Sequence, residues 1–508
     1  MGSCDEAGTS PGMESMRPRV VVIGGGLAGL QAALACAGGG AAVTLLEARK
    51  RLGGATFSFA REGLSIDNGQ HVFLRCCTAY RSFLKQLGVE RMTTLQERLS
   101  IPVVAEGGRV EWIRRRSLPP PLHLAESILR YGYLSGAERA QVAVAIQRLR
   151  GLDLADESLD LRSFGEWLTE QGQSANSVDA LWNLIALPTL NLPAAQASLA
   201  LATKVFQTGL LTDAGAADVG YALVPLSRLH GEPAALALAE SGAEVLTGTP
   251  AVAVEGGPPL AVRTEADRFP ADAVIVAVPH DEAAGLLPDR ALPDRAALAG
   301  LGHSPIINIH VGYDRPVMTH HFAAGFGTPV QWVFDRTASS GYGRGQLLAV
   351  SISAADGLVD RPVEELRNLF LPALERLFPR ARIARVQTFL VTRERKATFR
   401  QAPTTRALRP QAATAVPGLF LAGAWTDTGW PATMEGAVRS GVRAARLTLA
   451  YLGQLRAAER AGSAASATVA APVAARGAEP QPAAKPAAKA AKPRPRKTKP
   501  AGPVEISA

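Results

Sequence analysis

The chain has 508 residues, roughly three domains' worth, and 47% of them are hydrophobic, which excludes a wholly disordered protein. Its net charge is +9, and residues 463–508, with eight Lys and Arg against two Glu, contribute +6 of it. The rest of the chain therefore carries only +3, so we do not expect nucleic acid as a partner. The four cysteines have neither the spacing of metal ligands nor that of a disulfide framework, so no metal site is predicted.

The first predicted elements form a dinucleotide-binding unit. Val20–Ile23 is a short apolar strand, a G-x-G-x-x-G turn follows it, and a second strand ends at Glu47, 18 positions after Gly29. The glycines permit a tight turn and the approach of a pyrophosphate, which the N-terminus of the following helix binds. Glu47 is expected to accept hydrogen bonds from a ribose diol. The candidate contacts of this unit are Gly24, Gly26, Leu27, Ala28, Gly29 and Glu47.

A second glycine-rich turn follows directly after this strand. Its sequence is Arg51-Leu52-Gly53-Gly54-Ala55-Thr56, at a place where a nicotinamide enzyme normally continues its sheet. The turn resembles the second phosphate-contacting turn of the FAD-dependent amine oxidase and carotenoid desaturase superfamily. This resemblance implies that FAD is the cofactor and that Gly53, Gly54 and Ala55 contact it.

A predicted strand at 418–423 and a helix from about 433 to 452 complete the same site. The positive end of this helix is expected at the pyrimidine edge of the flavin, where negative charge gathers on reduction, so Ala424 and Met434 are further candidate contacts. Relatives in the superfamily usually have Asp or Glu at the position of Ala424. Asp427, three residues later, is one replacement for that carboxylate, and weaker FAD binding is the alternative.

The predicted fold class is α/β, with a discontinuous Rossmann-like FAD-binding domain and an inserted α+β substrate domain. The FAD-binding domain is expected at 17–110, 218–280 and 411–455, and the substrate domain at 111–217 and 281–410. The middle FAD-binding segment resembles the superfamily segment in which the region of Val252 meets the adenine through backbone groups. Residues 456–508 are rich in Ala, Pro and Lys and are expected to form a disordered basic tail.

The segment 181–211 is rich in Leu and Ala, but Asn183, Pro188, Asn191 and Pro193 interrupt it, so it fails the criterion of ~20 continuous apolar residues for a transmembrane helix. Two interpretations stay open: ordinary core helices, or the wall of an apolar tunnel with a membrane-docking face. No signal peptide is visible, so we expect a cytoplasmic protein, either free or in peripheral contact with the inner face of the cell membrane.

Two further stretches, 65–74 and 425–437, narrow the resemblance. Together with Arg395–Phe399 they resemble the hydroxysqualene dehydroxylase family of bacterial hopanoid pathways, over roughly 19–452. The resemblance implies that hydroxysqualene, an allylic alcohol, loses its hydroxyl and gains hydride from reduced FAD to give squalene. Such a reaction needs a dry apolar slot and at most one proton donor. The implied partners are the long-chain isoprenoid substrate and the upstream synthases of the squalene pathway.

The candidate proton donors are His71, Asp427 and Glu435, in that order. A histidine titrates near neutral pH, and His71 falls in the loop that passes the flavin ring in the superfamily. The other interpretations are a structural histidine for His71, a cofactor contact for Asp427, and a residue complementing a helix dipole for Glu435.

Two other functions stay open. A carotenoid or phytoene desaturase has the same fold, but hydride flows from its substrate to oxidised flavin. A non-catalytic flavoprotein that holds a polyisoprenoid for a partner synthase is the third interpretation, although a carrier has no need of a redox cofactor.

Overall fold

The computed structural model describes residues 17–469, with side chains to residue 458. A parallel sheet in the order β10-β2-β1-β14-β20 carries the first glycine turn at the end of β1. Its strands are β10 (Glu244–Thr247), β2 (Ala42–Glu47), β1 (Arg19–Ile23), β14 (Ala273–Val276) and β20 (Leu419–Leu421). Three separate stretches of chain therefore meet in one parallel sheet, and the predicted α/β class is confirmed.

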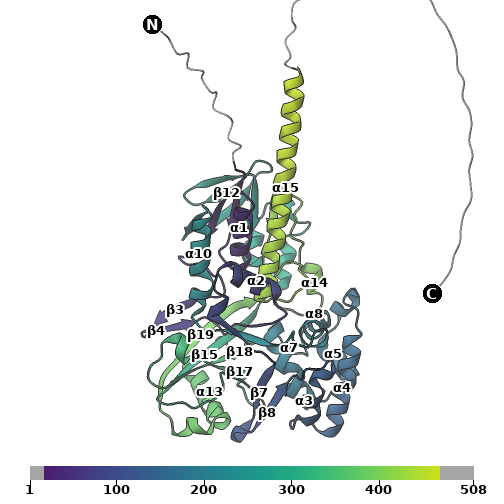
Figure 1. Cartoon of the computed structure of the whole chain (residues 1–508), viewed down its shortest axis with the longest axis vertical. Coiled ribbons are helices and arrows are strands. Elements are labelled where there is room, and N and C mark those ends of the chain that lie inside the picture. The colour runs from purple at the N-terminus through teal and green to yellow at the C-terminus, as the bar shows by residue number, and fades with distance from the viewer. Residues whose placement is uncertain (1–16, 470–508) are drawn as a thin grey trace, which may run out of the picture. The chain divides into compact units, whose positions relative to one another are not determined.

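Alternate residues of β1 face opposite sides of this sheet. Val20 and Val22 pack in one core, and Val21 and Ile23 pack in another. Helices on the first side are α1 (Leu27–Gly38), α2 (Thr78–Gln86), α10 (Gly231–Glu240) and α15 (Met434–Val469) (Figure 1). On the second side lies an antiparallel sheet of β11 (Ala251–Glu255), β12 (Leu260–Thr264) and β13 (Arg268–Ala271). Because both faces are covered, these strands are apolar almost throughout.

A second, seven-stranded sheet has the order β19-β15-β18-β17-β16-β7-β8. Its strands are β19 (Val386–Thr398), β15 (Ser304–Tyr313), β18 (Gln346–Ile352), β17 (Trp332–Asp335), β16 (Phe322–Gly325), β7 (Ser100–Val104) and β8 (Val110–Arg114). Helix α13 (Val363–Leu377) covers one face through an apolar core. Parallel pairing of β7 with β16 brings Ser100–Val104 into this sheet. The division into two domains, with its bounds, stays a prediction.

Two small antiparallel sheets hold the chain between the glycine turns and the second sheet. β3 (Ser58–Arg61) pairs with β4 (Leu64–Asp67), and β9 (Val219–Ala222) lies between β5 (Val72–Leu74) and β6 (Thr93–Leu95). Residues 68–71 join the two small sheets, and we call this segment the flavin loop. Both of its ends are thus fixed by strand pairing.

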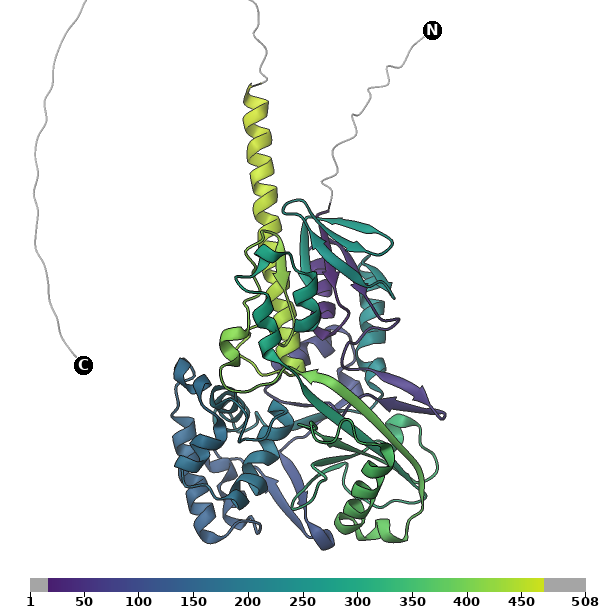
Figure 2. The ribbon, with the colours of Figure 1, turned by 180° about the vertical axis from the view of Figure 1, so that it is seen from behind.

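The first insertion is mostly helical. Its helices include α3 (Ala125–Arg130), α4 (Gly136–Arg150), α5 (Phe164–Glu170), α6 (Ala175–Ser177), α7 (Asn183–Leu190) and α8 (Leu199–Phe206). In Figures 1 and 2 these blue helices and the green α13 lie at opposite ends of the second sheet. Leu181, Leu190 and Leu211 are buried in one core with Val103 of β7, which supports ordinary core helices for 181–211. None of the helices within 17–469 is long and apolar enough to cross a membrane.

Helix α15 runs from Met434 to Val469, so residues 456–469 are helical rather than part of a disordered tail. The correction has a physical reason, because this stretch is rich in alanine, the best helix former. By its contacts the chain divides into one compact unit up to Arg456 and a second from Ala457. The rest of the predicted tail, 470–508, lies outside the described residues.

Candidate functional site

The two glycine turns face each other at backbone distance. A Cβ on Gly54, whose φ is +57°, would lie 2.7 Å from Gly26 Cα. A Cβ on Gly24, at φ +106°, would lie 2.6 Å from the carbonyl oxygen of Ala277, and one on Gly29 would lie 1.9 Å from that of Gly24. On Gly26 itself a Cβ would meet only Gly54 Cα, at 3.8 Å. The turns are therefore packed against their strands and leave bare backbone on one side, as a pyrophosphate requires.

The N-terminus of α1 opens onto this bare backbone. Leu27, Ala28 and Gly29 form the first turn of α1, and the first intrahelical hydrogen bond runs from the N–H of Leu30 to the carbonyl of Gly26. The N–H groups of the first turn have no intrahelical acceptor and are available to a phosphate. The expected contacts at Gly53 and Ala55 lie in the facing turn, where Gly53 N donates to the carbonyl of Gly25 at 2.8 Å.

Glu47, the last residue of β2, accepts hydrogen bonds from the first turn and from the segment that leads into the second. Its side chain is 8% exposed, and its Oε2 accepts from the N–H of Gly25 at 2.6 Å while Oε1 accepts from that of Arg49 at 2.8 Å. A carboxylate has about four acceptor positions, so two remain for the hydroxyls of a ribose. The residues at both turns fit the FAD expected from sequence. That they contact it stays a prediction.

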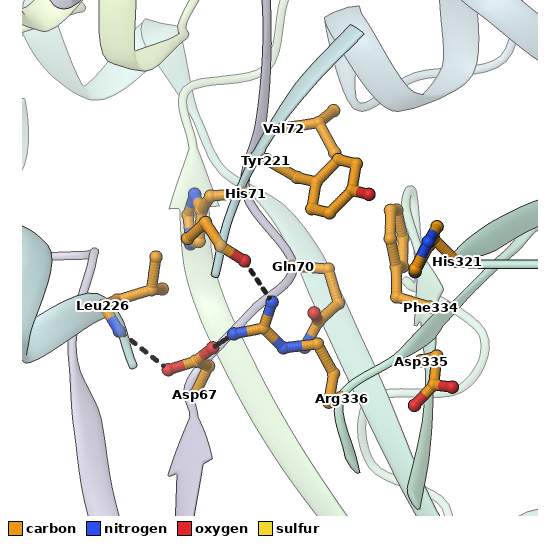
Figure 3. A pocket seen from close by; sticks show the side chains of 11 residues that line it. Asp67, Gln70, His71, Val72, Tyr221, Leu226, His321, Phe334, Asp335 and Arg336 are labelled. Atoms are coloured by element: carbon orange, nitrogen blue, oxygen red, sulfur yellow. Dashed lines mark hydrogen bonds and ion pairs between the residues drawn. The ribbon is translucent and has the colours of Figure 1, made fainter. Parts of the chain in front are cut away.

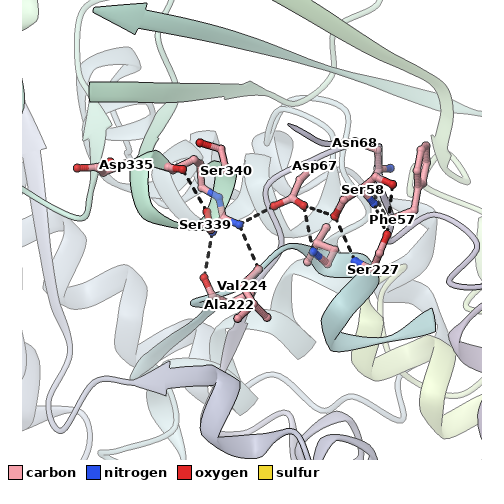
Figure 4. A network of polar contacts seen from close by, with 12 residues as sticks. Phe57, Ser58, Asp67, Asn68, Ala222, Val224, Ser227, Asp335, Ser339 and Ser340 are labelled. Carbon is pink, nitrogen blue, oxygen red and sulfur yellow. Dashed lines mark hydrogen bonds and ion pairs between the residues drawn. The ribbon is translucent and has the colours of Figure 1, made fainter. Parts of the chain in front are cut away.

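Asp67 fixes the start of the flavin loop through a buried ion pair. Its Oδ2 accepts from Arg336 Nη2 at 2.6 Å, and its Oδ1 accepts from Ser58 Oγ at 2.6 Å and from the N–H of Leu226 at 3.0 Å. Arg336 also donates to the carbonyl of Ala222 at 3.0 Å. Figure 4 shows this network between β4 and the end of β17. Arg336 lies 269 residues from Asp67 in sequence, and no motif marks it.

Asn68 ties the flavin loop to both the second glycine turn and the second sheet. Its Nδ2 donates to the carbonyl of Ala55 at 2.8 Å and to Glu394 Oε1 at 3.2 Å. Its own carbonyl accepts from Asn308 Nδ2 and from Thr392 Oγ1, both at 3.0 Å. The second glycine turn, which we call the cofactor turn, and strands β15 and β19 thus meet at one residue, Asn68.

His71 is partly buried and lines a pocket at the junction of β5, β9 and β17 (Figure 3). Burial lowers the pKa of His71 to about 4, with the positive charge of Arg336 lowering it and the negative charge of Asp67 opposing the shift. The imidazole is therefore neutral at pH 7. A neutral imidazole is a poor proton donor, so the lowered pKa is unfavourable for His71 as the acid, and its role stays a prediction.

Asp427 and Glu435 are both engaged elsewhere. Asp427 accepts from Gln411 Nε2 at 3.0 Å and from the N–H of Gly429 at 3.2 Å, contacts that brace its own loop. Glu435 is buried, and its carboxylate accepts from the N–H groups of Ala79 at 3.1 Å and Tyr80 at 2.7 Å, in the first turn of α2. These contacts explain Glu435 as a helix-terminus acceptor.

The remaining predicted contacts take ordinary positions. Met434 is the first residue of α15 and packs on the core of the parallel sheet. Val252 lies in β11 beside an irregularity of register and is 40% exposed. The carbonyl of Ala424 accepts from Arg409 Nη2 at 3.2 Å, and the same guanidinium donates to the carbonyl of Trp430 at 2.8 Å. Arg409 was not predicted from sequence, yet it donates to carbonyls along 424–430, the segment after β20 that we call the C-terminal loop.

The face of the second sheet that turns away from α13 carries both polar and apolar side chains. We call it the inner face. Asn308 on β15 pairs with Thr392 on β19 and with Ser351 on β18, while Ile306 pairs with Glu394. Ile306, Ser351, Thr392 and Glu394 are only partly buried. Asn308 is fully buried, and its Oδ1 has no hydrogen-bond partner among the described residues. The inner face therefore keeps accessible surface and an unused acceptor beside the flavin loop.

Residues 27–449 match the family described as flavin-containing amine oxidoreductases. A hydroxysqualene dehydroxylase of Rhodopseudomonas palustris is 32% identical over 448 residues, covering 86% of this chain and 99% of that protein. The hydroxysqualene dehydroxylase of Sinorhizobium fredii is 30% identical over 460 residues, covering 85% and 99%. A zeta-carotene desaturase of Synechocystis is 25% identical over 487 residues, covering 87% and 99%.

Solved structures show the same fold. A double mutant of putrescine oxidase superposes with a TM-score of 0.65 at 21% identity, covering 86% of this chain and 99% of that one. A putative protoporphyrinogen oxidase from Exiguobacterium gives 0.63 at 18% identity, covering 87% and 100%. These likenesses confirm the predicted fold class.

Proposed function

Since the chain belongs to the flavin-containing amine oxidoreductases and, among them, to the hydroxysqualene dehydroxylases, we propose that it reduces hydroxysqualene to squalene. It is an FAD-dependent oxidoreductase, as the sequence predicted. The observation that carries the proposal is the extent of the likeness, because the family match at 27–449 includes the second glycine turn, the flavin loop and the C-terminal loop.

The residues of this chain supply binding, orientation and exclusion of water. The bare backbone at Gly26 and Gly54 would hold the pyrophosphate of FAD, and Glu47 would hold a ribose. FAD, when bound and reduced, supplies a hydride. The flavin loop is pinned by Asp67 and Asn68, so the groups on either side of it keep a fixed geometry.

An aromatic cluster lies beside the pocket, and two of its rings, Tyr221 and Trp332, are only partly buried. The rings of Phe322 and Trp332 have centroids 6.1 Å apart, those of Trp332 and Phe334 lie 6.3 Å apart, and Tyr221 packs against Phe322 at 5.9 Å. Tyr221 and Phe334 also line the pocket with His71. We propose that the isoprenoid chain lies against the partly buried rings of Tyr221 and Trp332, where ring faces would also stabilise a developing allylic cation.

An anaerobic single turnover tests the proposed reaction. The reduced holoprotein is mixed with hydroxysqualene in detergent, and flavin absorbance is followed together with the extracted lipid. Reoxidation of the flavin should be matched mole for mole by squalene. A flavin that stays reduced while hydroxysqualene is bound would contradict the proposal.

The likeness to zeta-carotene desaturases favours a second function with the opposite electron flow. Oxidised holoprotein mixed anaerobically with phytoene distinguishes the two. Bleaching of the flavin with formation of a new double bond would identify a desaturase, and an unchanged flavin spectrum is expected for a dehydroxylase.

We also propose peripheral contact with an anionic membrane through one surface, the leucine patch. It consists of Leu118, Leu122 and Leu129, all exposed and within twelve residues of chain. Arg116 and Arg130 flank the patch and share a single acidic partner, Glu126, so the local charge is positive. Exposed apolar side chains rimmed by cations suit the interface of anionic lipids.

Sedimentation with phosphatidylglycerol vesicles tests the leucine patch. Replacing Leu118, Leu122 and Leu129 by Ser should reduce cosedimentation without loss of bound flavin. Leu236→Ser is the matched control, since Leu236 is equally apolar and exposed but lies on α10. Equal binding by both variants would contradict the proposal.

A further inference from the structure

Glu394 lies on the inner face at the place where the cofactor turn meets the second sheet. It pairs with Ile306 across β19 and β15, next to the pair formed by Asn308 and Thr392. Its Oε1 accepts from Asn68 Nδ2, and the same amide group donates to the carbonyl of Ala55 in the second glycine turn. A single amide nitrogen thus bridges Glu394 and the FAD-binding backbone.

The surroundings of Glu394 differ from those of its neighbours on β19. Arg395 and Lys396 are exposed and paired with Asp360 and Asp281. Glu394 is partly buried, and no ion pair with it is found among the described residues. The charged groups that act on it are Arg49 and Arg51, which follow β2.

This position shifts the pKa of Glu394. Burial raises the pKa of Glu394 above its ordinary value, while the hydrogen bond from Asn68 and the charges of Arg49 and Arg51 oppose the shift. A carboxyl group desolvated in this way keeps its proton to higher pH than an exposed one. Raised carboxyl pKa values are typical of general acids.

The other candidates lack this combination. His71 is neutral at pH 7, Asp427 is hydrogen-bonded within its own loop, and Glu435 is committed to the first turn of α2. Glu394 is the carboxyl group that shares a hydrogen-bond network with the cofactor turn through one residue of the flavin loop.

We propose that Glu394 is the proton donor to the departing hydroxyl of the substrate. The inference rests on the proposed dehydroxylation. The C–O bond breaks with its electron pair on oxygen, and the proton of Glu394 converts the leaving group to water. Carbon gains a hydride, with its two electrons, from the reduced cofactor, which is oxidised. Solvent then returns a proton to the carboxylate of Glu394, so that one alcohol, one hydride and one proton give one hydrocarbon and one water.

The first test compares Glu394→Gln with wild type in the anaerobic single turnover. The variant should reoxidise its flavin about 10²- to 10⁴-fold more slowly, the range in which general acids contribute. The wild-type rate should decline as the pH rises through the pKa of Glu394, and the rate of the variant should not show this decline. Glu365→Gln, an exposed substitution on α13, is the matched control and should behave as wild type.

A second variant separates proton donation from packing. Glu394→Ala should be slow, and formate at high concentration should restore part of its rate, because a small acid can replace a lost donor but not a lost contact. Equal flavin content in wild type and both variants shows that the cofactor site is intact.

Infrared difference spectroscopy gives a readout that does not depend on turnover. The protonated-carboxyl band that Glu394→Gln lacks should persist in wild type to higher pH than the band of an exposed carboxyl, with and without FAD. If wild type makes no squalene, the proposed function fails. If wild type makes squalene and Glu394→Gln keeps the wild-type rate, or the band is missing, the assignment of Glu394 fails on its own.

Discussion

The two sheets hold the site in different ways. At the parallel sheet the contacts are made by backbone, because Gly24, Gly29 and Gly54 leave no room for a Cβ. At the seven-stranded sheet they are made by side chains, since Asn308 and Glu394 reach Asn68 from strands far apart in sequence. A backbone site demands glycine at fixed spacing and so appears in the sequence as a motif. A side-chain site depends on register between distant strands, so the sequence alone does not reveal it.

The largest expected effect comes from closing the backbone site. Gly54→Val places a branched side chain at φ +57°, with its Cβ 2.7 Å from Gly26 Cα. The strain of about 1–3 kcal/mol adds to the steric clash between the turns, so FAD affinity should fall by about 100-fold or more. The flavin absorbance of the purified protein and titration of the apoprotein with FAD measure this.

A matched glycine should tolerate substitution. Gly38 is the last residue of α1, and a Cβ there would meet nothing within 4 Å. Gly38→Ala should keep full flavin content. Its free energy of unfolding should be unchanged or higher by about 0.5–1 kcal/mol, as measured by denaturant unfolding. If Gly38→Ala also loses flavin, the close approach of the two turns is not what the cofactor requires.

The next effect concerns the ion pair of Asp67 and Arg336, which links the region of the parallel sheet to the seven-stranded sheet. Arg336→Met leaves the carboxylate of Asp67 buried without its cation, which should lower the free energy of unfolding by about 3–5 kcal/mol. Urea denaturation measures the loss. The double variant Asp67→Asn with Arg336→Met should recover part of it, because no charge is then left unpaired. Equal losses in the single and double variants would show that the ion pair is not the link.

Buried histidines in both regions should make the protein sensitive to acid. Burial lowers the pKa of His230 to about 3 and that of His310 to about 4, from an ordinary value of 6.5. Below pH 6.5 the unfolded chain therefore binds protons that the native state does not, so stability is full above that pH and is lost as the pH falls. At about 1.4 kcal/mol per pKa unit, each histidine accounts for roughly 3 kcal/mol between pH 7 and pH 4.

Denaturation curves of His230→Gln and His310→Gln at several pH values test this linkage region by region. Each variant should lose less stability than wild type as the pH falls below 6.5. If the pH dependence of the free energy of unfolding changes in His230→Gln alone, the region of the parallel sheet unfolds before the second sheet. The two sheets would then not form one cooperative unit. An unchanged dependence in both variants would contradict the burial effect.

The difference between the regions also explains what could be predicted from the sequence. The parallel sheet, its two glycine turns and the start of α15 near Met434 follow from local patterns, and the structure contains them. The roles of Arg336 and Asn308 could not be predicted, because nothing in their neighbourhood in sequence indicates that they meet the flavin loop. The catalytic candidates were chosen for residue type near a motif. His71 and Glu435 illustrate the limit, since burial and hydrogen bonding decide what a titratable group can do.

The smallest expected loss of stability falls on Glu435, and its substitution decides between two acids. Glu435→Gln keeps the side-chain size but removes the charge that accepts from the first turn of α2 and pairs with Arg439. Loss of such a helix-terminus acceptor should cost about 1–2 kcal/mol in the free energy of unfolding, while the single-turnover rate per bound flavin stays unchanged. Thermal denaturation and the anaerobic turnover measure the two quantities on one preparation. If the rate instead fell 100-fold while stability was retained, Glu435 would be the proton donor, and the carboxyl of Glu394 would be reduced to holding Asn68 in place.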